Sequence, residues 1–288
     1  MKLVRIGSPG RERPAVVISR DTAVDVSSVV PDFTSDQLGD GVVERIRVAM
    51  ENDRDLPRIA LGDARLGPPL ADPGKIICVG LNYRAHAAEA NQPIPDEPIL
   101  FLKAPYTVVG PYDAVTIPPG SRKTDYEVEL AVVIGTLCRY LSSPADARAH
   151  VAGYTISNDV SEREYQLERG GQWDKGKNCE TFNPLGPWLV TADAVPDPGQ
   201  LRLGLDVNGE GRQASTTADM IFDVDHLVWY VSQFMTLLPG DIINTGTPQG
   251  VGAGFDPPRF LAAGDVVEAR IESLGRQRQV FRDYLKEL

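Results

Sequence analysis

The sequence predicts an α+β, strand-rich protein whose larger part is a rolled or closed sheet. Short, apolar, β-branched segments joined by Gly and Pro turns follow one another from residue 75 to about residue 271. Two helical patterns interrupt them, at 145–151 and 223–238, which is too few for the alternating strands and helices of a doubly wound sheet. The first 70 residues differ in texture and predict a separate, smaller unit.

The first unit, residues 1–70, is predicted to be a small N-terminal α+β domain. Three short apolar stretches between turn residues predict strands at 4–6, 14–18 and 23–26. A helix is expected over 35–50, with Ser35 as its cap, because apolar residues recur there at helical spacing. A Pro- and Gly-rich stretch at 66–74 marks the crossing into the second domain, residues 71–288. No catalytic constellation is found in the first unit.

The second domain is predicted to consist mainly of strands. The Asn208-Gly209 dipeptide is typical of a hairpin turn and supports this prediction. The expected strands are 76–80, 99–103, 114–117, 124–135, 153–159, 188–191, 203–209, 241–245 and 265–271.

The composition excludes several classes of protein. The 288 residues are 42% hydrophobic and 24% charged, with a net charge of -11 and no Lys/Arg run, so we expect neither a nucleic-acid nor a membrane partner. The N-terminus lacks the apolar core of a signal peptide, and a cytoplasmic location is expected. Cys78, Cys138 and Cys179 are too widely spaced for a zinc knuckle or a disulfide framework, and no His/Asn pattern makes one of them a nucleophile.

Two carboxylates at alternate positions of an expected strand are the most informative feature. Glu127 and Glu129 share one face of the strand, because side chains at i and i+2 point the same way. Their mutual repulsion is relieved by a proton or by a shared cation. Asp159, at the end of another expected strand, is the best third ligand, and three oxygen ligands suit Mg²⁺ or Mn²⁺. A solvated strand face near Arg122 and Lys123 remains the alternative.

Three further segments carry candidate chemistry. After the strand that ends at Gly80, a helical turn places His86 and Glu89 at i and i+3, where the carboxylate can hold the imidazole as a general base. A surface His–Glu pair is the plainer interpretation. A polar loop at 170–187 carries Lys177, which can support an oxyanion or simply be solvated. The glycine-rich segment 244–252 exposes backbone amides that can hold a carboxylate or phosphate, unless it is an ordinary turn.

These segments, in this order, resemble the fumarylacetoacetate hydrolase superfamily. The resemblance covers residues 75–279 and includes the small N-terminal domain of many members. It implies a mixed β-roll or barrel around a metal ion, usually in a homodimer. The motifs that carry it are Gly-Leu-Asn-Tyr-x-x-His-x-x-Glu, Asp-Tyr-Glu-x-Glu-Leu, Asn-Asp-Val-Ser-x-Arg, Lys-x-x-x-x-Phe-x-x-x-Gly-Pro and Gly-Thr-Pro-x-Gly-Val-Gly.

The resemblance also implies a role for each matching residue. Three carboxylates would bind Mg²⁺ or Mn²⁺: Glu127, Glu129 and Asp159. Three residues would be catalytic, with a dyad on a short lid that activates water and a lysine that contacts the substrate oxo group: His86, Glu89 and Lys177. Four residues would bind or surround the substrate, with a threonine at its carboxylate: Arg163, Gln166, Thr247 and Lys103.

The function that the resemblance implies is hydrolysis of the C–C bond of a 2,4-dioxo acid through a metal-bound enolate. The substrate is expected to be an acylpyruvate or a 2,4-diketo-3-deoxy sugar acid, because segment 166–177 resembles the 2,4-diketo-3-deoxy-L-fuconate hydrolase and ureidoglycolate lyase branch. A 2-hydroxyhepta-2,4-diene-1,7-dioate isomerase or decarboxylase, or a ureidoglycolate lyase, remains open on the same scaffold. A metal-stabilised binding protein without turnover is disfavoured by the intact His/Glu dyad.

Overall fold

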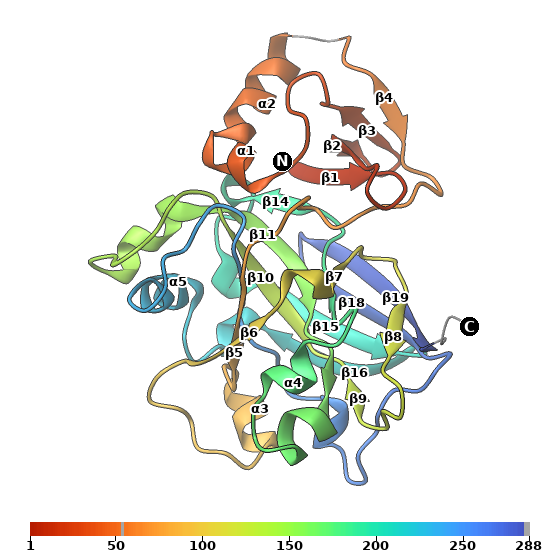
Figure 1. Cartoon of the computed structure of the whole chain (residues 1–288). Coiled ribbons are helices and arrows are strands. Elements are labelled where there is room, and N and C mark those ends of the chain that lie inside the picture. The colour runs from red at the N-terminus through yellow and green to blue at the C-terminus, as the bar shows by residue number, and fades with distance from the viewer. Residues whose placement is uncertain (53–54, 285–288) are drawn as a thin grey trace.

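The computed structural model describes residues 1–52 and 55–284. It is a mixed α+β structure dominated by strands, which confirms the predicted fold class. The N-terminal strands and two helices lie at one end of the molecule, and the remaining strands form its centre (Figure 1). None of the described helices is long and apolar enough to span a membrane.

One large sheet crosses the whole molecule. Within the described residues it has ten strands in the order β4 (Arg58–Ala60), β3 (Thr22–Asp25), β2 (Arg13–Ser19), β1 (Lys2–Ile6), β14 (Leu189–Thr191), β11 (Val151–Asn158), β10 (Val128–Ile134), β17 (Ile242–Asn244), β5 (Ile76–Gly80) and β6 (Ile99–Lys103). Antiparallel pairing of β1 with β14 joins the N-terminal strands to the rest. The division at residue 70 stays a prediction, since this sheet runs across it.

A second sheet packs against the centre of the first. Its strands, in order, are β16 (Glu210–Thr216), β15 (Arg202–Val207), β18 (Val266–Ile271), β19 (Gly275–Asp283) and β8 (Val115–Ile117). Val128, Leu130 and Val132 of β10 are fully buried in the core between the sheets, together with residues of β15 and β18. Ala131 and Val133, on the other face of β10, belong to a second buried cluster. Strand β10 is therefore buried on both faces and forms a rigid base for side chains at its beginning.

The expected strand over 124–135 is wrong in one respect that matters for the site. It is split into β9 (Thr124–Asp125) and β10, and Tyr126 and Glu127 lie between them outside regular strand structure. Strand β9 pairs with β12 (Ser161–Glu162) instead. The other short pair is β13 (Asn183–Pro184) with β7 (Val108–Val109). Strands β16 and β19 were not expected, because their many charged and amide side chains hide the alternating pattern.

The helices are shorter than the sequence predicted. The expected helix over 35–50 consists of α1 (Ser35–Gly39) and α2 (Val42–Asn52), separated at Gly41, whose φ of +69° belongs to the left-handed region. Thr34, not Ser35, caps α1 by accepting a hydrogen bond from the Gln37 amide. Helix α5 (Val224–Ser232) ends earlier than the expected residue 238. The other α-helices are α3 (Arg84–Glu89) and α4 (Asp174–Lys177).

Short 3₁₀ and π-helical segments complete the chain. The expected helix at 145–151 is a 3₁₀ helix, η2 (Pro144–His150), in which Ser143 and Asp146 form a capping box. Residues after the Asp159 position form a π-helical turn, η3 (Glu164–Glu168). The remaining 3₁₀ turns are η1 (Pro105–Thr107), η4 (Ala192–Ala194), η5 (Pro198–Gln200), η6 (Thr217–Asp219) and η7 (Gly252–Gly254).

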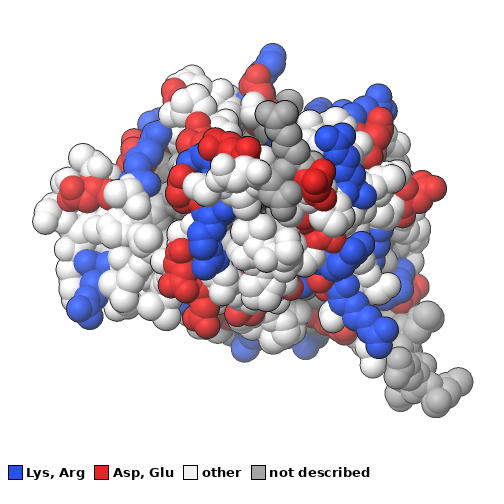
Figure 2. All heavy atoms as spheres, turned by 90° about the horizontal axis from the view of Figure 1, so that it is seen from above, with Lys and Arg blue, Asp and Glu red and all other residues white. Residues whose placement is uncertain are grey.

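Charged side chains are mixed on the face that Figure 2 shows. Acidic and basic residues alternate over this surface, and neither sign forms a continuous field there (Figure 2). Several of the charges pair with one another, as Arg47 does with Asp193 at 2.9 Å. Such exposed pairs contribute little to stability, in contrast to buried pairs such as those of the site described next.

Candidate metal centre and catalytic pocket

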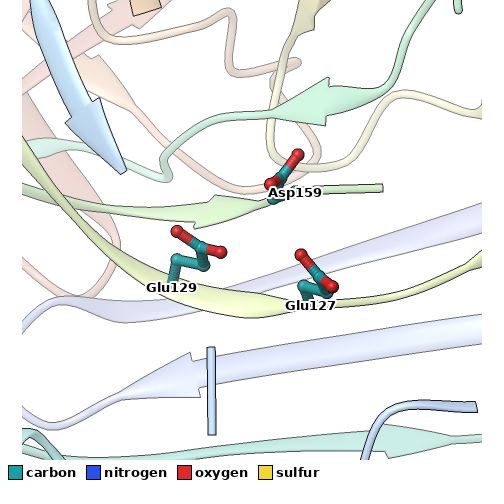
Figure 3. Close-up of side chains that lie close together, drawn as sticks. All are labelled: Glu127, Glu129 and Asp159. Atoms are coloured by element: carbon teal, nitrogen blue, oxygen red, sulfur yellow. The ribbon is translucent and has the colours of Figure 1, made fainter. Parts of the chain in front are cut away.

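Three buried carboxylates converge at the beginning of β10 and the end of β11. In the antiparallel register Val128 pairs with Asn158, so Glu127 and Asp159 continue the ladder, and the Asp159 amide donates to the Glu127 carbonyl at 2.9 Å. Oxygen atoms of Glu127, Glu129 and Asp159 all lie within 4.8 Å of one another (Figure 3). Their residues are 5%, 2% and 0% exposed, so the alternative of a solvated strand face does not hold.

The three carboxylates have unequal partners. Glu127 accepts hydrogen bonds from Arg163 Nη2 at 2.6 Å and Lys177 Nζ at 2.7 Å. Asp159 accepts from Lys103 Nζ at 2.6 Å and from the same Lys177 Nζ at 2.7 Å. Among the described residues, Glu129 accepts a hydrogen bond only from the backbone, from the Gly246 amide at 2.8 Å. Two carboxylates are therefore neutralised by protein cations and the third is not.

The pKa values follow from this arrangement. Burial, together with the neighbouring Asp159 and Glu127, raises the pKa of Glu129 well above its usual value. Burial also opposes ionisation of Glu127, but Lys177 and Arg163 outweigh it and lower the pKa of that carboxyl. Burial disfavours the Lys177 ammonium, yet Asp159 and Glu127 more than compensate and raise its pKa. Glu129 is thus the carboxylate that needs a further positive charge in order to ionise.

A hard divalent cation fits this donor set. Three carboxylates in one buried cluster can supply oxygen ligands, and no imidazole or thiolate of the described residues is part of the cluster, which favours Mg²⁺ or Mn²⁺ over zinc. A cation held by Glu127, Glu129 and Asp159 would compensate the charge of Glu129, which no Lys or Arg in the described part of the chain contacts.

The His/Glu pair faces the same cavity. His86 Nδ1 lies 3.0 Å from Glu89 Oε2 on α3, and Glu89 Oε1 accepts a hydrogen bond from the Gly250 amide at 2.8 Å. Both side chains line a cavity of ≈ 590 Å³ together with Glu127 and Glu129. The alternative of a plain surface pair does not hold, since a fixed carboxylate orients an imidazole that lines this cavity.

The glycine-rich loop after β17 supports these groups from one side. Its Gly246 and Gly250 amides donate to Glu129 and Glu89, and its Gly252 and Ala253 amides donate to Asp125 at 2.7 and 3.0 Å. The expectation that these amides can hold a carboxylate is met by carboxylates of the protein itself.

The residues expected to contact the substrate differ in whether they line the cavity. Arg163, Gln166 and Lys177 line the cavity, and Arg163 Nη1 donates to Gln166 Oε1 at 3.0 Å. Thr247 also lines it, but its hydroxyl donates to the Val128 carbonyl at 3.0 Å. Lys103 is buried behind Asp159 and is not among the lining residues, so it is placed to hold Asp159 rather than to face the cavity. Their roles toward a substrate stay predictions.

Two residues of the site had no assigned role in the sequence. Asp125 is fully buried and accepts from Arg163 Nε at 2.9 Å in addition to the loop amides, so it links the loop to the guanidinium that contacts Glu127. Its position in the Asp-Tyr-Glu motif was the only indication in the sequence that it belongs to the site. Gln213 Nε2 donates to the Thr247 hydroxyl at 2.9 Å. Gln213 lies on β16, a strand that the sequence pattern did not indicate.

The chain is similar to known proteins over its whole length. A family model described as fumarylacetoacetate (FAA) hydrolase C-terminal matches residues 75–282. A protein of Burkholderia multivorans, provisionally named a hydrolase, is 50% identical over 283 residues, which are 98% of this chain and 99% of the relative.

Two solved structures share the fold. A Mycobacterium abscessus protein, provisionally assigned as a 2-hydroxyhepta-2,4-diene-1,7-dioate isomerase, is 34% identical with a TM-score of 0.84, over 99% of this chain and 100% of that one. Maleylpyruvate hydrolase from Sphingobium sp. SYK-6, in complex with manganese(II) and pyruvate, is 32% identical with a TM-score of 0.82, over the same shares of the two chains.

Proposed function

This chain belongs to the fumarylacetoacetate hydrolase family, and on that premise we propose that it is a metal-dependent hydrolase that cleaves the C–C bond of a 2,4-dioxo acid. One observation carries the proposal: the oriented His86–Glu89 pair lines the same cavity as two carboxylates of the buried cluster, Glu127 and Glu129. The first suits activation of water and the second suits a divalent cation. The manganese and pyruvate bound by the Sphingobium hydrolase support the same interpretation.

The cation, when held by the three carboxylates, would act as a Lewis acid toward the 2-oxo acid end of the substrate. The residues of the chain supply the remaining steps. Glu89 keeps the His86 ring oriented, and His86 removes a proton from a water molecule that attacks the C4 carbonyl. The C3–C4 bond then breaks, and its electron pair remains with C3. Lys177 supplies positive charge next to the cluster for the oxygen on which that negative charge is delocalised.

The reaction balances without an oxidant or reductant. One water and one 2,4-dioxo acid give pyruvate, or a substituted 2-oxo acid, and a second carboxylic acid. The proton that His86 removes protonates C3, and the new carboxylic acid releases one proton to solvent near neutral pH. No residue needs to form a covalent bond with the substrate, which agrees with the lack of a nucleophile pattern in the sequence.

The experiment measures pyruvate release from an acylpyruvate by coupling to lactate dehydrogenase, while the enol absorbance is followed in parallel. We expect pyruvate and the acyl acid in equal amounts, loss of activity with a chelator and recovery with Mg²⁺ or Mn²⁺. His86→Ala should lower kcat by about 10²–10⁴-fold, the usual contribution of a positioned general base. Pyruvate release that withstands both the chelator and the substitution would refute the mechanism.

Isomerisation is a second candidate, supported by the similarity to the provisionally assigned dioate isomerase. Without attack by water, the same site would catalyse migration of a double bond or keto–enol tautomerisation. Decarboxylation of an oxo acid or cleavage of ureidoglycolate could take place at the same residues. Enol absorbance that changes while no pyruvate forms would favour this candidate. We also propose that the chain acts as a homodimer, which its mass in solution tests.

A further inference from the structure

The cavity has an apolar wall that the proposed chemistry does not use. Its large apolar lining residues are Leu81, Ile99, Phe101, Leu167, Trp173 and Val251. The rings of Phe101 and Trp173 lie edge to face with centroids 5.6 Å apart and an interplanar angle of 67°. They come from β6 and from the residue before α4, so two separate elements build one aromatic surface.

This aromatic surface is closely fitted to its surroundings. A Cβ at Gly80 would lie 2.6 Å from a Trp173 ring carbon, so a residue without a side chain lets the indole lie against the end of β5. Lys177 Nζ lies 5.0 Å above the centroid of the Phe101 ring. The aromatic surface therefore begins directly beside the ammonium group that contacts Glu127.

Within the described part of the chain, no Lys or Arg of the cavity lining is free to receive a second acidic group. Among the described lining residues the Lys and Arg side chains are Arg163 and Lys177. Arg163 donates through all three nitrogens, to Asp125, Gln166 and Glu127. The Lys177 ammonium is shared by two carboxylates of the cluster. A carboxylate lying on the aromatic wall would lose hydration without gaining an ion pair.

Building on the proposed function, we infer that the group on C4 of the substrate is uncharged and apolar, an alkyl or aryl acyl chain, and that Trp173 and Phe101 select it. The apolar chain gains by leaving water at the wall, whereas a terminal carboxylate or a row of hydroxyl groups finds few partners there. This inference favours the acylpyruvate class over 2,4-diketo-3-deoxy sugar acids and over dicarboxylic substrates.

The test compares two ligands of equal length that differ only at the end distant from the 2-oxo acid, with pyruvate as the reference that lacks this end. The protein is loaded with Mn²⁺, and the affinities of 2-oxoheptanoate, 2-oxoheptanedioate and pyruvate are measured by calorimetry. Turnover of 2,4-dioxoheptanoate and 2,4-dioxoheptanedioate is measured by pyruvate release. We expect the monoacid of each pair to be favoured at least about ten-fold, in Kd and in kcat/KM respectively, since each apolar contact contributes modestly and an unpaired charge is strongly rejected.

Two substitutions connect this preference to the aromatic surface. Trp173→Ala should weaken 2-oxoheptanoate binding about ten-fold more than it weakens pyruvate binding, and Trp173→Phe should restore most of the difference. Trp229→Ala is the matched control, because Trp229 is also a half-buried tryptophan but belongs to the aromatic group on α5, outside this cavity. It should leave the preference unchanged.

The outcomes separate this inference from the proposed function. Diacids that bind as tightly as monoacids, or a preference that Trp173→Ala leaves intact, would overturn the inference. Failure of both dioxo acids to release pyruvate would instead refute the proposed hydrolysis. In that case the two affinities still decide whether the wall selects apolar groups.

Discussion

Glu127→Gln and Glu129→Gln should change stability in opposite ways when no divalent cation is present. Both residues are buried, they lie two positions apart in the chain, and each substitution removes one carboxylate. Glu127 contacts two protein cations, at 2.6 and 2.7 Å, whereas among the described residues Glu129 accepts a hydrogen bond only from an amide. Loss of the first carboxylate breaks ion pairs. Loss of the second removes a buried carboxyl whose ionisation is opposed by burial and by its two neighbours, so the folded protein no longer bears that cost.

The expected magnitudes follow from these contacts. Breaking a buried ion pair costs about 3–5 kcal/mol in unfolding free energy. For 288 residues the unfolding entropy is roughly 0.6 kcal/mol per kelvin, so Glu127→Gln should lower Tm by roughly 5–8 °C. In Glu129→Gln the amide oxygen can still accept from Gly246, and Tm in chelator should stay unchanged or rise. A cation at about 100 times its Kd should add about 2.7 kcal/mol to the wild-type protein, and this gain should largely disappear in Glu129→Gln.

The assay is differential scanning calorimetry of the wild-type and both variants, first in chelator and then over a titration of Mg²⁺ or Mn²⁺. Asp225→Asn, which removes a partly exposed ion pair with Arg148, is the control and should cost at most about 1 kcal/mol. Equal losses for the two glutamine variants in chelator would refute the charge assignment. A full cation-dependent rise of Tm in Glu129→Gln would show that Glu129 is not a ligand.

Three further predictions test the supports of the site. Asp125→Asn removes the buried acceptor of Arg163 and of two loop amides, so the unfolding free energy should fall by about 3–5 kcal/mol in a denaturant titration; an unchanged midpoint would contradict this. Gly254→Ala would place a Cβ 2.4 Å from the Glu89 Cδ and so displace the carboxylate that orients His86. The kcat should fall about 10²-fold, while the cation-dependent rise of Tm persists. Loss of both activity and the rise of Tm would indicate general damage to the structure instead. Burial raises the pKa of the Cys179 thiol to about 11, so its reactive thiolate forms only as the pH rises toward that value. Cys179→Ser should therefore keep the wild-type kcat at pH 7, and the reaction of Cys179 with a thiol reagent should accelerate between pH 8 and pH 11. Fast labelling of this thiol at pH 7 would contradict the prediction.

Much of the candidate metal centre could be predicted because it depends on local periodicity. The i and i+2 spacing places Glu127 and Glu129 on one side, and the apolar residues between and after them require burial. The alternation of Val128, Leu130 and Val132 fits the core between the sheets, as the structure confirms. Polar strands were harder to predict: β19 alternates buried Gln with exposed Arg, a pattern that apolar periodicity does not detect.

The partners of those carboxylates were decided by tertiary structure, because they are distant in sequence. Lys103 and Asp159 are 56 positions apart, and the Gly246 amide is 117 positions from Glu129. Pairing and packing of the strands bring these groups together, and only then does burial make their charges strong enough to matter. The sequence by itself determined which residues are candidates for the oxygen ligands and the base. The tertiary structure decided which of these carboxylates is left without a cation partner among the described residues, since that depends on distances between segments that no local pattern encodes.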